Sequence, residues 1–475
     1  MNHPNSYQGQ RVVVLGLAKS GVSAAKVFHA LGADVVVNDR KPREQSPEAE
    51  ELEQAGIAVI CGGHPDDLIT ERTALLVKNP GIPYSAPPVR QALALGVEVV
   101  TEVEIAYALS PAPIIGITGS NGKTTTTTLL GELLQAAGLS PIVAGNIGTP
   151  LCEAATRAEA SQWIVAELSS FQLKGTSAFR PKVGVLLNLA QTHLDYHGDM
   201  DDYVASKAKL FANMTAEDTA VLNWDDAICR TLAEGMAAKL LPFSLTQQLE
   251  QGVYVEPPYP VSLEEEDGAE RELVYRDRLG QRHRLIACAE LGIPGRHNAA
   301  NAMAAAAAAI AAGAAPEQLE APLRAFRGVE HRLELVTERG GIAYYNDSKA
   351  TNPTATIMSV RSLQGEMILI AGGLDRGSDY MELLPLFQHR LKGLVTLGET
   401  RGKLAHVAEL AGLERVIVVE PEEVAEDTLR AAVRHATALA EPGDIVLLSP
   451  ACASWDMFTS YEQRGRIFKD SAHTL

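Results

Sequence analysis

A glycine-rich segment carries the sharpest chemical signal in the sequence. Residues 116–125 read Gly-Ile-Thr-Gly-Ser-Asn-Gly-Lys-Thr-Thr, and the apolar run at 114–118 leads into them. A loop of this kind between a strand and a helix surrounds phosphate oxygens with backbone N–H groups, and the helix N-terminus adds a favourable dipole. Lys123 would reach the β- and γ-phosphates, and the Thr124 hydroxyl would bind Mg²⁺. The segment predicts a nucleoside triphosphate site, although the strict motif has glycine at position 117, where this chain has isoleucine.

Polar residues after two further apolar runs add candidate metal ligands. Glu167 ends the run at 163–166, where a carboxylate could hold a metal ion beside the loop; a solvent-facing glutamate is the alternative. The run at 183–187 leads into a polar loop that contains His193, Asp195 and His197. That spacing would also suit zinc, but no fourth ligand accompanies it, and the nearby phosphate loop favours magnesium.

A second glycine loop stands near the N-terminus. Residues 16–21 read Gly-Leu-Ala-Lys-Ser-Gly, which is similar to the dinucleotide-binding pattern, and Asp39 follows as a candidate ribose ligand. The middle glycine, which would allow close approach of a pyrophosphate, is Ala18 here. An NAD site is therefore disfavoured.

These loops need elements to position them, and the chain predicts three α/β blocks. The length of 475 residues corresponds to about three domains. Apolar strand-like runs separated by helix-length segments predict parallel sheets with crossover helices. We expect domains at 1–110, 111–328 and 329–475: Rossmann-like at both ends, with a central ATPase-like parallel sheet between them. Residues 252–290 alternate charged and apolar residues and predict a solvated antiparallel hairpin region, and 298–312 predict an alanine-rich helix.

Composition narrows the function classes. Asp and Glu number 59 against 41 for Lys and Arg, giving a net charge of −18, which disfavours a protein that coats nucleic acid. The polar N-terminus has no signal-like apolar region, and the alanine run at 302–312 is too short to span a bilayer. The five cysteines are scattered and lack a Cys-x-x-Cys pair, so we expect neither disulfides nor a zinc cage. A cytoplasmic protein without membrane insertion is the expectation.

Six segments in order along the chain resemble the Mur ligases. They lie at 118–125, 167–173, 295–298, 331–332, 346–352 and 449–458. The resemblance implies an ATP-dependent amide-bond ligase of peptidoglycan precursor synthesis. Its expected reaction adds D-glutamate to UDP-N-acetylmuramoyl-L-alanine through an acyl phosphate and a tetrahedral intermediate, with release of ADP and phosphate.

The resemblance also implies a role for each matching residue. The ATP-binding set is Gly119, Ser120, Asn121, Gly122, Lys123, Thr124, Thr125, Asn298, Arg332 and Asp347. The catalytic set is Lys123, Glu167, His193, Lys207 and Lys349, and the ligands of two Mg²⁺ ions are Thr124, Glu167, His193 and Lys207. Lys207 is expected to carry a carbamate derived from CO₂, although the pattern of 203–211 alone reads as a solvated helix face.

Two further sets concern the substrates. The uridine substrate is expected to bind Lys19, Ser20, Asp39, Asn79, Gly81 and Asn146, and D-glutamate to bind Thr351, Arg376, Ser454 and Tyr461. The alternatives are another Mur ligase step, a folylpolyglutamate-synthase-like ligase, a nucleotide switch and an NAD-dependent oxidoreductase. The folylpolyglutamate enzymes lack a domain before their phosphate loop, whereas more than a hundred residues precede Gly116 here. We expect a monomer.

Overall fold

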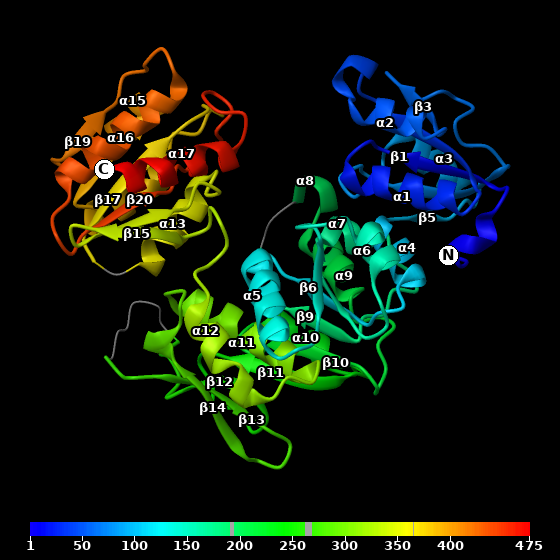
Figure 1. Ribbon diagram of the computed structural model, residues 1–475, viewed down its shortest axis with the longest axis horizontal. Coiled ribbons are helices and arrows are strands. Elements are labelled where there is room, and N and C mark those ends of the chain that lie inside the picture. Colours follow the sequence, from blue (N-terminus) through cyan, green and yellow to red (C-terminus); the bar gives the residue numbers. More distant parts are fainter. Residues whose placement is uncertain (191–193, 262–267, 364) are drawn as a thin grey trace. The chain divides into compact units, whose positions relative to one another are not determined.

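The computed structural model describes residues 1–190, 194–261, 268–363 and 365–475 (Figure 1). The chain forms two compact units, one made of Met1–Leu291 with Asn298–Ala325, the other of Gly292–His297 with Phe326–Leu475. The first unit contains two sheets and the second contains one. This arrangement confirms the predicted three-part α/β fold. The exact domain limits remain a prediction.

The N-terminal sheet has five parallel strands in the order β3-β2-β1-β4-β5. They are β1 Arg11–Leu15, β2 Asp34–Asp39, β3 Ala58–Cys61, β4 Thr73–Lys78 and β5 Val99–Val100. The helices are α1 Lys19–Ala30, α2 Glu48–Gln54, α3 Pro87–Ala94 and α4 Glu102–Leu109, with short 3₁₀ turns at Pro4–Tyr7 and Arg43–Gln45. Val12, Val13 and Val14 are fully buried, as expected for a central strand covered on both faces.

The central sheet has nine strands in the order β14-β13-β12-β11-β10-β9-β6-β8-β7. They are β6 Ile114–Thr118, β7 Pro141–Gly145, β8 Trp163–Glu167, β9 Val183–Leu186, β10 Thr219–Asn223, β11 Lys239–Ser244, β12 Gly252–Glu256, β13 Glu272–Arg276 and β14 Arg282–Ala287. The helices are α5 Lys123–Ala136, α6 Leu151–Arg157, α7 Ser170–Lys174, α8 Leu194–His197, α9 Met200–Ala208, α10 Ala227–Ala233, α11 Arg296–Ala311 and α12 Glu320–Ala325, with 3₁₀ turns at Cys288–Glu290 and Pro316–Gln318. The phosphate loop leaves β6 between β8 and β9, so polar residues that end these neighbours lie beside it.

The antiparallel region is confirmed, with one difference. β12 pairs antiparallel with β13, and β13 with β14. However, β12 also pairs with β11 in parallel, and Val253, Tyr254 and Val255 are fully buried. The first strand of this region is therefore part of the core and not a solvated edge.

The second unit contains a six-stranded sheet in the order β15-β16-β20-β17-β18-β19. The strands are β15 Glu334–Arg339, β16 Ile342–Asn346, β17 Met367–Gly372, β18 Gly393–Leu397, β19 Val416–Val418 and β20 Ile445–Leu448. The helices are α13 Pro353–Ser362, α14 Leu384–Arg390, α15 Arg401–Leu410, α16 Ala425–Leu439 and α17 Tyr461–Thr474, with a 3₁₀ turn at Met381–Leu383. Only β15 runs antiparallel to its neighbour.

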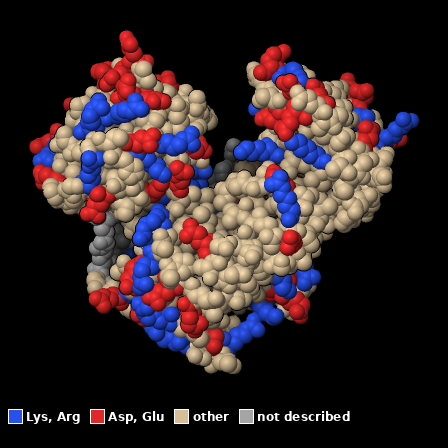
Figure 2. All heavy atoms as spheres, in the orientation of Figure 1, with Lys and Arg blue, Asp and Glu red and all other residues tan. Residues whose placement is uncertain are grey.

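The cysteines and the helix lengths were both considered in the expectations from composition. All five cysteines are free thiols. No helix in the described part of the chain has both the length and the apolar content that crossing a bilayer requires. On the face shown in Figure 2, basic and acidic side chains are interspersed over both units.

Candidate active site

Two glycines give the phosphate loop a bare backbone. Gly122 precedes α5 with φ +82°, in the left-handed region, and a Cβ there would overlap the side-chain oxygen of Asn301. A Cβ on Gly119 would lie 2.9 Å from Cβ of Leu187. Only glycine fits both positions, so no side chain projects from the backbone at these two points between β6 and α5.

The departure from the strict motif at position 117 has a packing reason. Ile117 is a fully buried residue of β6, so it belongs to the strand and not to the loop. A Cβ on Gly116 would lie 2.7 Å from Cδ1 of Leu210. Gly116 therefore leaves room for the side chain of Leu210 to pack in the core.

Lys123 begins α5 and folds back over the loop. Its Nζ donates to the carbonyl oxygens of Gly119 (2.7 Å) and Ser120 (2.9 Å). Thr124, the next residue, is buried. These are the positions that a phosphate-binding lysine and a metal-binding hydroxyl would occupy.

Two residues without a predicted role fix the loop from outside. Asn188 follows β9 and accepts two hydrogen bonds from the loop. Its backbone carbonyl accepts from the N–H of Ser120 (2.9 Å), and its side-chain Oδ1 accepts from the N–H of Asn121 (2.9 Å). The hydroxyl of Tyr203, on α9, lies 2.8 Å from Oγ of Ser120. A polar residue directly after a buried strand was a usable signal for Asn188. Nothing local indicated Tyr203.

Lys207 lies beneath the phosphate loop. Its side chain is 1% exposed, and its Nζ donates to Thr118 Oγ1 (3.2 Å) and to the carbonyl of Gly119 (2.9 Å). Burial, with a smaller contribution from Lys123, holds the pKa of this amine well below its usual range, and Glu167 partly opposes that shift. The expectation of a solvated helix face is wrong for this residue. The amine is buried at the site, and burial disfavours its charged form.

Glu167 ends β8 beside the loop and is 1% exposed. Its Oε1 accepts from Nδ2 of Asn146 (2.9 Å), whereas its Oε2 has no hydrogen-bond partner within the described ranges. The solvent-facing alternative is excluded. An unsatisfied buried carboxylate oxygen is costly unless a cation or a proton meets it, so the donor set of Glu167 and Thr124 fits Mg²⁺. Asn146 was expected at the uridine substrate, and the structure places it against Glu167.

His193 lies outside the described residues. His197, four positions later, is buried, with Nδ1 2.6 Å from Asp202 Oδ2 and Nε2 2.9 Å from Ser170 Oγ. Both ring nitrogens are occupied by protein groups, and this arrangement disfavours the zinc alternative.

The N-terminal loop is built around two glycines. Gly16 has φ +103°, and a Cβ there would lie 2.7 Å from Cβ of Asn79. A Cβ on Gly21 would overlap the carbonyl oxygen of Gly16. Asp39 Oδ2 accepts from the N–H of Leu17 (2.8 Å), which places its carboxylate at the loop.

The remaining candidates for the uridine substrate lie around the same loop. Ser20 donates to Oδ1 of Asn79 (2.9 Å). Lys19 and Gly81 are exposed. Five of the six predicted residues are thus in the N-terminal α/β part, and Asn146 is not.

In the second unit, a buried carboxylate follows β16. Asp347 accepts from Ser449 Oγ (2.7 Å) and from the N–H of Leu333 (3.3 Å). Burial raises its pKa to about 6, against the lowering effect of those hydrogen bonds. Nearby, Lys349 donates to the hydroxyl of Tyr461 (3.0 Å). Lys349 and Tyr461, assigned separately above, are direct neighbours.

The other residues predicted for D-glutamate also belong to this unit. The N–H of Thr351 donates to the carbonyl of Lys349 (2.9 Å). The N–H of Leu374 donates to Ala453 (3.0 Å), which brings the loop of Arg376 beside buried Ser454. The Arg376 guanidinium stacks over the Trp455 ring at 5.1 Å.

The predicted ATP residues divide between the units. Asn298, buried in the first turn of α11, accepts from Nδ2 of Asn301 (3.3 Å) and belongs to the first unit with the phosphate loop. Arg332 and Asp347 belong to the second.

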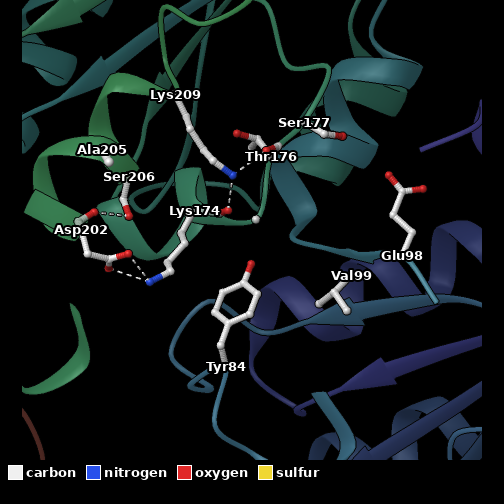
Figure 3. Close-up of a pocket in the computed structure, with 11 residues that line it drawn as sticks. Tyr84, Glu98, Val99, Lys174, Thr176, Ser177, Asp202, Ala205, Ser206 and Lys209 are labelled. Atoms are coloured by element: carbon white, nitrogen blue, oxygen red, sulfur yellow. Dashed lines mark hydrogen bonds and ion pairs between the residues drawn. The ribbon is translucent and has the colours of Figure 1, made fainter. Parts of the chain in front are cut away.

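A pocket of about 380 Å³ opens in the first unit, apart from the phosphate loop (Figure 3). Its lining includes Tyr84 and Glu98 of the N-terminal part and Lys174, Asp202 and Lys209 of the central part. No predicted site residue lines it.

Comparison with known proteins identifies the family. Three family models match in order along the chain: the MurD-like N-terminal domain at 10–101, the Mur ligase middle domain at 117–309 and the Mur ligase glutamate ligase domain at 331–452. The chain belongs to the Mur ligase family. It is therefore a ligase.

Mur ligases with curated names are similar over the full length. The UDP-N-acetylmuramoylalanine–D-glutamate ligase of Geobacillus sp. (strain WCH70) is 48% identical, over 99% of this chain and 98% of that protein. The enzyme of the same name from Bacillus cytotoxicus is 43% identical, over the whole of both chains.

Solved Mur ligase structures share the fold. UDP-N-acetylmuramate–alanine ligase MurC from Thermotoga maritima has a TM-score of 0.57 at 18% identity, over 98% of this chain and 99% of that one. MurF from Acinetobacter baumannii has a TM-score of 0.58 at 17% identity, over 98% and 91%.

Proposed function

We propose that this Mur ligase uses ATP to join D-glutamate to UDP-N-acetylmuramoyl-L-alanine in peptidoglycan precursor synthesis. The similarity to D-glutamate ligases over essentially the full length supports this choice of substrates. The observation that carries the chemistry is the buried Lys207 and Glu167 beside an accessible phosphate loop.

A carboxylate is a poor acyl donor because an oxide would have to leave. Transfer of the γ-phosphoryl group from ATP to the substrate carboxylate replaces that leaving group with phosphate. The amine of D-glutamate then attacks the acyl carbon and forms a tetrahedral intermediate, which expels phosphate as the amide forms. Negative charge develops in each step, so cationic groups must already be in position.

The phosphate loop supplies part of that charge. Gly119, Ser120, Asn121 and Gly122 are proposed to bind the ATP phosphates. The N–H groups of Ser120 and Asn121 would exchange Asn188 for a phosphate oxygen, and Lys123 would turn from the loop carbonyls to the β- and γ-phosphates. Thr124, Glu167 and His193 are the proposed protein ligands for magnesium, and Thr125 is proposed to bind ATP. Bound Mg²⁺ would neutralise phosphate charge during the transfer.

Lys207 is the proposed site of a carbamate. Its neutral amine nitrogen would attack the carbon of CO₂, forming an N–C bond and losing a proton to solvent. The product is a carboxylate, which suits a second Mg²⁺ and replaces an uncompensated buried amine. The low pKa of the amine, caused mainly by burial, favours the reactive form.

The remaining roles follow the domains. We assign the uridine substrate to the N-terminal loop with Lys19, Ser20, Asp39, Asn79 and Gly81. Asn146, which contacts Glu167, is assigned to the acyl end of the same substrate. Asn298, Arg332 and Asp347 are proposed to bind ATP, and Lys349 to approach the phosphate and carbamate. Thr351, Arg376, Ser454 and Tyr461 are proposed to bind D-glutamate.

The organisation around the reaction is also a proposal. We place the domain limits at 1–110, 111–328 and 329–475 and propose a monomer in the cytoplasm. A folylpolyglutamate-type enzyme is disfavoured, because a MurD-like N-terminal domain precedes the phosphate loop.

The test is phosphate release with ATP, Mg²⁺ and UDP-N-acetylmuramoyl-L-alanine, run in parallel with D-glutamate, L-lysine and L-alanine. We expect release with D-glutamate only. Equal release with L-lysine or L-alanine would contradict the assigned acceptor, and no release with any of the three would contradict the function.

A further inference from the structure

A buried lysine that has no role in the proposed reaction lies at the end of β4. Lys78 is fully buried, and its Nζ donates to the carbonyls of Asn79 (3.4 Å) and Pro80 (3.0 Å) and to the hydroxyl of Tyr196 (3.1 Å). Burial, with repulsion from Lys174, lowers its pKa to about 7. All three of these hydrogen bonds go to residues 79–80 and to Tyr196, so Lys78 holds this loop and Tyr196 together.

Tyr196 meets the same loop from the central part of the first unit. Its hydroxyl, besides accepting from Lys78, lies 3.1 Å from the carbonyl oxygen of Pro80 and 3.3 Å from that of Ile82. The single hydroxyl proton of Tyr196 is therefore shared between the carbonyl oxygens of Pro80 and Ile82. The segment 79–82, which carries Asn79 and Gly81 of the proposed uridine site, is thereby attached to α8.

Helix α8 is itself fixed by aromatic and polar contacts. The ring of Tyr196 packs edge-on against Phe171, with centroids 4.5 Å apart, and the next residue, His197, stacks on the same ring at 5.4 Å. Both nitrogens of His197 are held by Ser170 and Asp202, as described above. The orientation of α8 is therefore determined by α7 and α9.

An ion pair sets the position of Asp202. Both of its oxygens accept from Nζ of Lys174, at 2.7 and 2.6 Å (Figure 3). The pair lines the 380 Å³ pocket together with Tyr84, whose ring lies beneath the Lys174 ammonium at 5.5 Å. This group belongs to the support of His197 and lies outside the proposed reaction centre.

The contacts continue to the phosphate loop. His197 packs edge-on against Tyr203 at 5.3 Å, and the Tyr203 hydroxyl meets Ser120 Oγ at 2.8 Å. A continuous chain of packed side chains thus runs from segment 79–82 through Tyr196, His197 and Tyr203 to Ser120. Each end of the chain is a single tyrosine hydroxyl.

We propose that Tyr196 is a positioning residue that couples the uridine-substrate loop 79–82 to the phosphate loop through His197 and Tyr203. The identity of the two ligands rests on the proposed function. Ordering of one loop on binding would be passed to the other through the hydroxyls of Tyr196 and Tyr203, so occupation of one site would raise the affinity of the other. Contact alone does not demonstrate coupling, and the test must measure it.

The experiment is calorimetric titration of the full chain with UDP-N-acetylmuramoyl-L-alanine in Mg²⁺. The titration is done with and without a saturating non-hydrolysable ATP analogue. The quantity compared is the factor by which the analogue tightens binding of the uridine substrate. Tyr196→Phe and Tyr203→Phe remove one hydroxyl each and keep the rings, and Tyr275→Phe on β13 is the matched control.

We expect the wild type and Tyr275→Phe to show tightening of about fivefold or more, within the usual range of coupling between sites. Tyr196→Phe and Tyr203→Phe should each reduce the factor to about twofold or less. The double variant should lose no more than either single variant, because both lie on one chain of contacts.

Three results would overturn the inference: a wild type without tightening, a Tyr196→Phe variant that keeps the wild-type factor, or single effects that add in the double variant. Weaker binding of the uridine substrate both with and without the analogue, at an unchanged factor, would likewise show a merely structural role. If one variant fails to fold, the other end of the chain still supplies the test. A wild type that shows coupling but forms no product with D-glutamate would contradict the proposed function and leave this inference standing.

Discussion

The side-chain amine of Lys207 donates to the carbonyl oxygen of Gly119 at 2.9 Å, although the two residues are 88 positions apart in the chain. The contact puts a buried amine of low pKa directly beneath the phosphate loop. The proposed role of Lys207, a carbamate-bearing residue beside the ATP phosphates, gives the first prediction.

Lys207→Ala should lower ligase activity by at least about 10²-fold, the scale expected when charge stabilisation of the transition state is lost. Added bicarbonate should not restore activity, because no amine remains to carbamylate, whereas formate or acetate should restore a fraction. Steady-state phosphate release measures both effects. Lys239→Ala, at an exposed lysine of β11, is the control and should resemble the wild type. Full activity of Lys207→Ala would refute the assignment.

Glu167→Gln keeps the size of the side chain and removes its charge. The buried Oε2 has no hydrogen-bond partner in the described part of the chain, so a cation is its expected partner. We expect activity to fall by about 10²-fold and the Mg²⁺ concentration for half-maximal rate to rise, with the thermal midpoint little changed. An unaltered Mg²⁺ titration would show that Glu167 does not bind the metal.

Gly122→Ala and Gly138→Ala separate backbone strain from steric overlap. Both glycines have similar positive φ, +82° and +77°. A Cβ at 122 overlaps Asn301, whereas a Cβ at 138 meets nothing within 4 Å. Each variant should lose about 1 kcal/mol of stability from the left-handed conformation, and only Gly122→Ala should lose ATP binding as well. Calorimetric titration with ATP decides; equal affinities in the two variants would contradict the role of the bare loop.

Glu102 provides a test of stability against pH away from the site. The residue is buried at the start of α4 and accepts from the N–H of Cys152 (2.9 Å), and burial raises its pKa from 4.5 to about 7. Since folding favours the protonated form, this stabilisation is complete below pH 4.5 and is lost as the pH rises through 7, a change of about 3 kcal/mol.

Glu102→Gln does not titrate, so the gain in its thermal midpoint over the wild type should grow between pH 5 and pH 8. Melting curves at the two values measure it, with the exposed Glu48→Gln as the control. A gain that is the same at both values would contradict the shifted carboxyl group.

Local pattern was sufficient for the phosphate loop and for the buried strands next to it. β6 has three isoleucines among its five residues and is followed by glycines, so strand, loop and helix were all predictable. The strands β5, β7, β10, β11 and β15 were not predicted. β5 has only two residues, and β15 is mostly half-exposed, so neither gives a clear period-two signal.

The positions of the candidate site residues were also predictable from local sequence in some cases and not in others. Glu167 was identifiable because it ends an apolar run. The burial of Lys207 was not, because the local pattern of α9 reads as a solvated helix face, whereas Lys207 packs against Thr118 and Gly119, which are distant in the sequence. The assignment of Asn146 to the uridine substrate stays a prediction, and its contact with Glu167 was not indicated by the sequence. Long-range packing decides such cases, and a sequence read locally does not contain it.

The central claim is that ATP held at the phosphate loop phosphorylates the carboxylate of the uridine-bearing substrate. The most direct measurement uses UDP-N-acetylmuramoyl-L-alanine with ¹⁸O in that carboxylate, incubated with the enzyme, ATP, Mg²⁺ and D-glutamate, followed by mass analysis of the released phosphate. The account predicts one ¹⁸O atom in each phosphate released. Amide product formed together with unlabelled phosphate would contradict it.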